Sequence, residues 1–236
     1  MKCLLSVCLS VLAGVAIFAA SKPEQTLEMQ KGISVQMAAS RHAAPMPEAD
    51  QENAWVVTVT TDGRIYFGVE AVTPETLTRQ MQIRPRNRAA KLYVKADAGT
   101  PFRSVRQVLY AARVDLFDDV VLLTSQPEPA QPSTIVPGTI VPPKGLEVWI
   151  GTEAGSNRIA VQIGSAEGSA TLKINNQPVA PAMLQSRLGH IFDDRGGRVV
   201  VLTAAGDVPF AQVVRAIDAS RAAGASRVSM PITPEV

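Results

Sequence analysis

The residue types that most often do chemistry in proteins are few in this chain and lie far apart. Both cysteines, Cys3 and Cys8, fall in the first apolar run, so the rest of the chain has no thiol nucleophile, thiolate metal site or disulfide. The two histidines, His42 and His190, have no neighbouring ligand types at metal-binding spacing. We therefore expect no metal site and no cofactor.

Two pairs of adjacent carboxylates, Asp118-Asp119 and Asp193-Asp194, come nearest to a catalytic motif. Neither pair is flanked by a base, a nucleophile or a further ligand. The glycines are spread over strands and turns, with no phosphate-loop lysine following them. The sequence predicts that the protein is not an enzyme. A hydrolase remains an alternative only if folding brings distant polar residues together in a pocket.

Basic residues cluster once, as Arg84, Arg86 and Arg88. A solvated loop explains them, and the alternative is contact with acidic peptidoglycan or lipid headgroups, because clustered arginines bind anionic groups. Over the whole chain 23 basic and 21 acidic residues leave a formal charge of +2. That balance gives no electrostatic reason to expect nucleic acid as a partner.

The N-terminal residues 1–22 are predicted to be a transmembrane anchor or a signal peptide. From Cys3 to Ser21 no residue is charged, and a helix of this length, about 28 Å, nearly matches a hydrocarbon core of about 30 Å. Ala19-Ala20-Ser21 also resembles a cleavage site of small residues. Both alternatives send the rest of the chain across the membrane.

The remaining sequence repeats itself with a period near 108 residues, which predicts two domains of the same fold. The residues 31–37, KGISVQM, return as residues 144–150, KGLEVWI. Further on, Pro101-Phe102 returns as Pro209-Phe210, and the apolar positions stay in phase despite small shifts in the offset. We place the two domains at residues 31–125 and 144–236. Residues 126–143 hold six prolines and are predicted to be an extended linker of up to about 50 Å.

Each domain is predicted to be α+β with the order ββαβαβ, an antiparallel-rich sheet with two helices on one face, behind the one N-terminal apolar helix. Alternating apolar residues in WVVTVT and RIYFG, joined by Asp62-Gly63, indicate a hairpin with a two-residue turn. Thr73 and Pro74 are typical of a helix start. A second helix is indicated by apolar residues at helical spacing, and we expect this stripe to be buried: Phe102, Val105, Leu109 and Ala112, with Phe210, Val213, Ile217 and Ser220 in the second domain.

This arrangement resembles the ExbD/TolR family of biopolymer transport proteins, whose members carry a juxtamembrane GI-x-V-x-L segment and a helix-and-strand signature that begins with D-x-x-V-P-[FY]. Gly32-Ile33 to Met37 is similar to the juxtamembrane segment. The signature is clearest in the second domain, at Asp207, Pro209, Phe210, Val213, Ile217, Ala219, Arg221 and Gly224. The first domain matches it at Asp97, Pro101, Phe102, Val105, Leu109, Ala111 and Arg113, with Leu116 in place of the glycine.

The resemblance implies an accessory subunit of the inner membrane, with periplasmic domains, beside a proton-channel partner of the ExbB/TolQ type. Such complexes work on a TonB- or TolA-like protein, and TolR-like members are thought to contact peptidoglycan. Relatives act as dimers, so the two domains are expected to form a pseudo-dimer, and homo-oligomers are a further expectation. Contact by strand addition at a sheet edge is a plausible mechanism.

Two departures from the family weaken the expectation of ion coupling. The family's membrane-embedded aspartate has no counterpart, since residues 3–21 contain no Asp or Glu. The usual cytoplasmic N-terminus is reduced to Met1-Lys2. Either the coding sequence starts further upstream, or the protein has lost direct coupling. The alternative function is therefore a periplasmic binding or scaffolding module, secreted after signal cleavage.

Overall fold

The computed structural model describes residues 33–85, 87, 89–126, 142–151, 158–166, 169–194 and 197–232. The predicted N-terminal helix and most of the proline-rich linker lie outside these residues. Among the residues that are described, no helix is long and apolar enough to cross a membrane.

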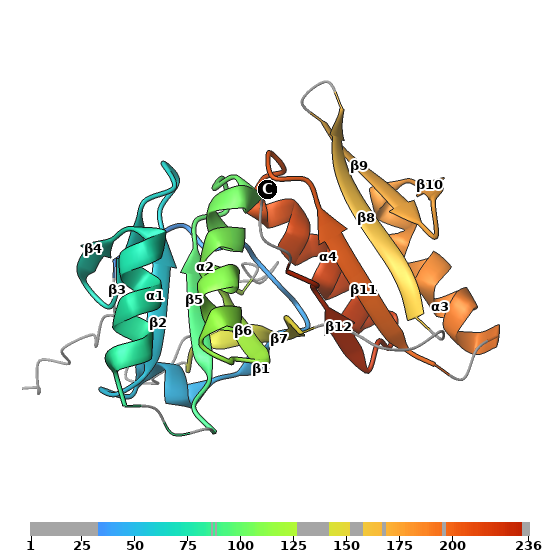
Figure 1. Cartoon of the computed structure of the whole chain (residues 1–236). Helices are drawn as coiled ribbons and strands as arrows, with labels where there is room; N and C mark the ends of the chain where they lie inside the picture. Colours follow the sequence, from blue (N-terminus) through green and yellow to red (C-terminus); the bar gives the residue numbers. More distant parts are fainter. Residues whose placement is uncertain are drawn as a thin grey trace, which may run out of the picture.

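Two successive runs of elements have the same order of strands and helices (Figure 1). The first run comprises β2 (Trp55–Val59), β3 (Ile65–Phe67), β4 (Glu70–Val72), α1 (Pro74–Ile83), β5 (Leu92–Ala96), α2 (Phe102–Val114) and β6 (Asp119–Thr124). The second run comprises β8 (Arg158–Ala166), β9 (Ser169–Ile174), β10 (Gln177–Val179), the 3-10 turn η2 (Pro181–Met183), α3 (Leu184–Asp194), β11 (Val199–Ala204), α4 (Phe210–Ala222) and β12 (Arg227–Ser229). Before them lie β1 (Ala44–Pro45) and the 3-10 turn η1 (Pro47–Asp50), and between them lies β7 (Lys144–Trp149).

Each run contains one strand more than the predicted order ββαβαβ. A third short strand, β4 or β10, pairs antiparallel with the second strand before the chain enters the first helix. These segments have three residues each and no apolar alternation, so sequence periodicity gave no signal for them. The hairpin turn also differs: Thr60 N donates to Arg64 O (3.0 Å), which leaves a three-residue loop with Gly63 at φ 83°.

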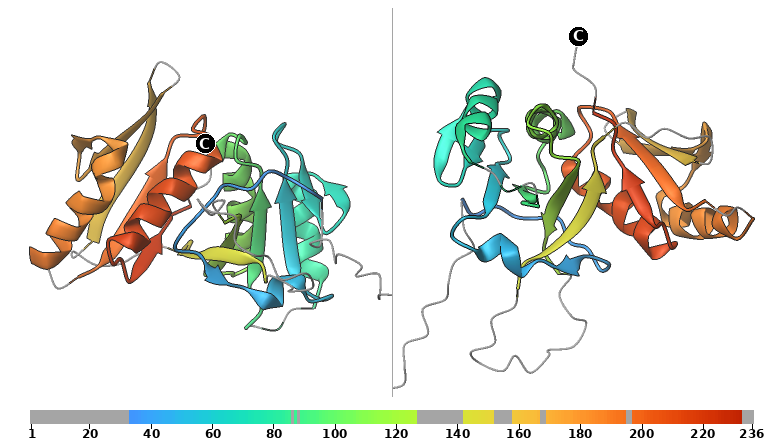
Figure 2. Two further views of the ribbon diagram at one scale, coloured as in Figure 1. Left: turned by 180° about the vertical axis from the view of Figure 1, so that it is seen from behind. Right: turned by 60° about the horizontal axis from the view of Figure 1, so that its bottom comes forward.

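The described strands form one mixed sheet rather than two antiparallel-rich ones. Their order is β10-β9-β8-β11-β12-β7-β6-β5-β2-β3-β4, and β1 pairs with β7. Parallel pairing joins β2 to β5, β5 to β6, β8 to β11 and β11 to β12. Because the long sheet twists, α1 and α2 face the viewer in Figure 1, whereas α3 and α4 face the viewer in the reversed view of Figure 2.

One apolar core runs through both runs of elements. Side chains such as Leu77 on α1, Val105 on α2, Leu188 on α3 and Val213 on α4 belong to a single cluster of buried residues. Two separate domains would each have a core of their own, but strand β7 pairs with both β6 and β12 and so joins the strands of the two runs in one sheet. The helix layers above them meet because the sheet is continuous.

The first half of the sheet is also covered on its helix-free face. There Met46 and Ala49, from the segment around η1, pack against Val56, Tyr93 and Val121 in a second, smaller cluster. For this reason β2 is buried along its whole length instead of alternating. By contrast, β8 shows the expected alternation over Ile159, Val161 and Ile163.

Lys95 on β5 is a charged residue on this covered face, and only 3% of it is exposed. Burial lowers the pKa of Lys95 from its ordinary value of 10.5, and Asp50 on η1 opposes that effect in part. A lysine with a lower pKa in the folded state binds its proton more tightly in the unfolded chain. The free energy of unfolding therefore gains a contribution that rises with pH from the lowered pKa up to 10.5.

Replacing Lys95 by methionine is expected to remove this rise. Urea unfolding between pH 7 and 10 should give a flatter dependence of the unfolding free energy on pH for Lys95→Met than for the wild type. Lys91→Met is the control, because a hydrogen bond to Glu147 raises the pKa of Lys91 and places its contribution above 10.5. Equal slopes for Lys95→Met and the wild type would contradict the prediction.

Candidate functional site

The predicted signature residues meet where the two runs touch. The segment before α2 and the segment before α4 form an antiparallel bridge between Pro101 and Pro209. Four backbone hydrogen bonds join them: Phe102 N to Val208 O (2.8 Å), Phe210 N to Thr100 O (2.8 Å), Arg103 N to Gly206 O (2.9 Å) and Ala211 N to Ala98 O (2.9 Å). Each bond has a counterpart with both partners shifted by 108 positions, as in 102 and 210, or 100 and 208. The contact is therefore nearly two-fold symmetric.

The sequence explains why these helices need each other. The first backbone N–H groups of a helix have no partner within it. At α2 and α4 the N-cap residue is a proline, Pro101 or Pro209, which has no side chain to accept a hydrogen bond. The carbonyl oxygens of the other run take that place, so each helix start is completed only when the two runs meet.

Most other signature positions are core residues. Phe102, Val105, Leu109, Phe210, Val213 and Ile217 are buried, as their helical spacing predicted. Of the two aspartates, Asp97 accepts hydrogen bonds from Gly99 N (2.9 Å) and Gln36 N (3.1 Å), whereas Asp207 is exposed. Of the signature positions, Pro101, Phe102, Pro209 and Phe210 take part in the backbone contact between the runs.

The two signature arginines, Arg113 and Arg221, lie in the last turns of α2 and α4. Arg113 Nη1 forms an ion pair with Asp118 Oδ1 (2.6 Å), and both side chains are partly exposed. Arg221 donates to three backbone oxygens, those of Glu147 on β7 (2.7 Å), Ser226 (3.0 Å) and Ala225 (3.3 Å). Burial lowers the pKa of Arg221, and Glu147 opposes this. Arg221 thus fastens the joining strand β7 to the second run.

The position where the first domain departs from the signature has a left-handed backbone in both runs. Leu116 has φ 59° and Gly224 has φ 96°. Each follows a helix whose last carbonyls are bonded in the same pattern, such as Phe117 N to Ala112 O (3.0 Å) and Ala225 N to Ser220 O (3.0 Å). Leucine is strained here, since its β-carbon crowds the backbone in this conformation.

Leu116→Gly is therefore expected to raise the free energy of unfolding by about 1 kcal/mol, because the strain is removed and the 74% exposed side chain contributes little packing. The matched change Gly224→Ala should lower it by about 1 kcal/mol. Urea denaturation of both variants tests this, and a loss of stability in Leu116→Gly would refute it.

A strap of residues ahead of β1 crosses from one run to the other, a contact that sequence reasoning missed. Ser40 N donates to Ser125 O (3.0 Å) at the end of β6. The Ser40 hydroxyl (2.5 Å) and His42 N (2.9 Å) donate to Asp218 Oδ1 on α4, and His42 Nδ1 lies 3.3 Å from the same atom. Burial works to raise the pKa of Asp218, but the hydrogen bonds from Ser40 and His42 outweigh it and lower that pKa.

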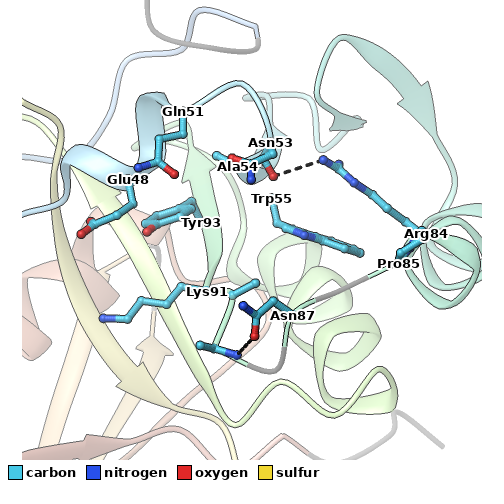
Figure 3. A pocket seen from close by; sticks show the side chains of 12 residues that line it. Glu48, Gln51, Asn53, Ala54, Trp55, Arg84, Pro85, Asn87, Lys91 and Tyr93 are labelled. Carbon is cyan, nitrogen blue, oxygen red and sulfur yellow. Dashed lines mark hydrogen bonds between the residues drawn. The ribbon is translucent and has the colours of Figure 1, made fainter.

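A cavity of about 640 Å³ opens in the first run where β2 and β5 begin and α1 ends (Figure 3). Its lining includes the rings of Trp55 and Tyr93, the cations Arg84 and Lys91, and Glu48. The Arg84 guanidinium lies 4.7 Å from the Trp55 ring centroid, and its Nη2 donates to Asn53 O (3.2 Å). Lys91 pairs with Glu147 (2.9 Å), and burial raises the pKa of Tyr93. The two rings are almost wholly buried, so the groups that suit a ligand here are the cations Arg84 and Lys91, which could bind a polar or anionic group.

The remaining candidates from the sequence stay apart. Burial is the main cause that raises the pKa of Asp119, and the nearby carboxylate of Glu147 raises it further. Asp118 forms an ion pair with Arg113. Asp193 and Asp194 are the last two residues of α3. Arg86 and Arg88 fall outside the described residues. Among the residues described, no three His, Cys, Asp or Glu side chains are placed to hold a metal ion.

Comparison with known families matches part of the chain. Residues 12–127 match the family described as biopolymer transport protein ExbD/TolR. No curated protein and no solved structure matches the chain. The matched stretch contains the first run of elements, although the signature had seemed clearer in the second.

Proposed function

Because this chain belongs to the ExbD/TolR family of biopolymer transport proteins through residues 12–127, we propose that it is an accessory subunit of an envelope transport system driven by the proton gradient. It acts by protein contact in the periplasm and is not itself an enzyme. Its partners are an ExbB/TolQ-like membrane protein and a TonB/TolA-like protein. Residues 1–22 anchor it in the inner membrane as a single pass.

Within this proposal, residues 31–125 and 144–236 are tandem copies of the family's periplasmic domain, joined by residues 126–143. The observation that supports it best is the symmetric pairing of the segments before α2 and α4, in which Pro101 and Pro209 meet. One chain then supplies the pair of domains for which two single-domain subunits are otherwise needed.

The partner proposal is tested in the native envelope. The tagged full-length chain should fractionate with the inner membrane, and cross-linking should recover it with an ExbB/TolQ-like protein. Replacing Arg103, which lies exposed at the contact between the runs, by a photo-reactive residue offers a defined cross-linking point. Recovery of the chain only as a soluble species cleaved near Ser21 would overturn the subunit proposal.

The second candidate function is a secreted periplasmic module that binds peptidoglycan or an envelope protein. The cavity with Trp55, Arg84 and Lys91 favours it, as does the absence of an acidic residue from positions 3–21. Mass spectrometry of the mature N-terminus and sedimentation with peptidoglycan sacculi test it together. Arg84→Ala should reduce sedimentation several-fold, whereas Arg158→Ala on β8, remote from the cavity, should not.

A further inference from the structure

Three large aliphatic side chains lie exposed where the helices of the first run end. Ile83, the last residue of α1, is 75% exposed, and Val114, the last residue of α2, is 40% exposed. Leu116, two residues later, is 74% exposed. Because β4, β5 and β6 run in the same direction, both helices end where these strands begin (Figure 1). We call the three side chains the aliphatic tips.

The aliphatic tips are neighbours. Thr76 on α1 and Gln107 on α2 line the same cavity. Seven residues later, which is about 10 Å along each helix, the chain reaches Ile83 and Val114. Seven residues are nearly two turns, so these two side chains return to the facing sides of their helices. With Leu116 just beyond Val114, the tips gather apolar surface at one end of the helix layer.

The second run has small or polar residues at the matching positions. In the order of the tips they are His190, Ala222 and Gly224. The offset is 107 between α1 and α3, where buried Met81 matches buried Leu188, and 108 between α2 and α4. The shared fold therefore forms without aliphatic side chains at these positions.

Leu116 also occupies a backbone conformation that favours glycine. Its φ is 59°, whereas the matching Gly224 has φ 96°. A bulky residue at positive φ costs stability, and an exposed side chain returns little of that cost through packing within the chain. A strained, exposed leucine is explained if another surface covers it.

The cavity lined by Trp55 and Arg84 opens at the same end of the first run (Figure 3). Arg84 follows Ile83 directly in the chain. Its guanidinium contacts the rings of Trp55 (4.7 Å) and Phe67 (5.4 Å) and donates to Asn53 O (3.2 Å). These contacts are all with neutral groups and balance none of its charge. A cation thus lies beside the aliphatic tips.

This combination fits a bilayer better than a folded partner. A specific protein interface buries about 800 Å² on each partner. Even aromatic side chains bury only about 150–250 Å² each, so three aliphatic ones supply much less than such an interface needs. Insertion into a bilayer requires no matching surface, and anionic headgroups attract arginine.

We propose that this end of the first run docks on the anionic surface of a lipid bilayer, with the aliphatic tips among the acyl chains and Arg84 at a headgroup phosphate. This rests on the anchored subunit proposed above. Ten residues separate residue 22 from residue 33, and they extend to about 33 Å. Gln36 is bonded to Ala98 at the far end of β5, whose five residues span about 17 Å. The anchor therefore reaches far enough for the tips to face the membrane.

The test uses the full-length chain in vesicles, with Cys3 and Cys8 replaced by serine and a fluorescent label on Val114→Cys. In vesicles that contain phosphatidylglycerol, a nitroxide on the lipid acyl chains should quench this label at least about twofold more than the same label on Asp207→Cys. Asp207 is exposed near the start of α4, where the runs meet and away from the tips. Vesicles of phosphatidylcholine alone should give weaker quenching, because they offer no anionic headgroup.

Substitutions separate the parts of the proposal. Ile83→Ser and Leu116→Gly should each lower the quenching of the label at position 114 at least about twofold. Because Leu116→Gly is expected to stabilise the fold, unfolding does not explain its loss of quenching. Arg84→Gln should remove the difference between the two kinds of vesicle. Arg215→Gln, which changes an exposed arginine on α4, is the control and should alter neither result.

Equal quenching at the two label positions, or quenching that Leu116→Gly leaves unchanged, overturns the docking. A label at position 114 that is shielded only at high protein concentration, without quenching by the lipid nitroxide, would assign the tips to a second copy of the chain and also overturn it. Equal quenching with and without phosphatidylglycerol would refute the part given to Arg84. Cross-linking to a membrane partner is measured separately, so the proposed function fails or stands apart from this result.

Discussion

Replacing Phe210 by alanine is expected to lower the free energy of unfolding by about 3–5 kcal/mol and to destabilise both halves of the molecule together. Phe210 is fully buried at the start of α4, next to the contact with the segment before α2. Its cavity would open in a core that is continuous across the two runs. Because the core is shared, we expect the loss of stability to extend to the first run, although Phe210 belongs to the second.

The two tryptophans of the chain make this measurable, because Trp55 lies in the first run and Trp149 on the joining strand β7. The variant Trp149→Phe keeps Trp55 as its one tryptophan, and the variant Trp55→Phe keeps Trp149. Urea unfolding followed by fluorescence should shift by the same amount in both backgrounds when Phe210→Ala is added. A shift seen by Trp149 alone would mean that the halves unfold independently. Phe102→Ala is the matched change in the first run.

Arg221→Ala is expected to lower the free energy of unfolding by about 2–3 kcal/mol, whereas Arg113→Ala should cost less than about 1 kcal/mol. The two arginines occupy corresponding positions on α4 and α2 but have different partners. Arg221 satisfies backbone oxygens on β7 and after α4, and its loss leaves partly buried acceptors without a charged donor. Arg113 forms an ion pair that is largely open to water.

Chemical denaturation of both variants in parallel measures the difference, and hydrogen exchange locates it. In Arg221→Ala the amides of Lys144–Trp149 should exchange faster, because the side chain that bonds to the Glu147 carbonyl is gone. Arg113→Ala should leave those amides unchanged. Similar costs for the two substitutions, or unchanged protection of β7 in Arg221→Ala, would show that Arg221 does not hold that strand.

The amino-acid sequence by itself determined the elements that local rules govern. Thr73 caps α1 by accepting from Thr76 N (3.2 Å), and Pro74 is the first residue of that helix, as their types predicted. The stripes that begin at Phe102 and Phe210 are buried, because helical spacing states which face is apolar. The family assignment rested on the same signature, and the match of residues 12–127 to that family contains the first of its two copies.

Only the tertiary structure decided how the two runs meet. Short edge strands such as β4 have no periodicity of their own and form because β3 offers unpaired backbone groups. The strap from Ser40 to Asp218 depends on residues 178 positions apart, which no local pattern relates. The same holds for the pairing of Pro101 with Pro209: a repeat states that two segments are alike, but whether they contact each other depends on which backbone groups the completed fold leaves without partners.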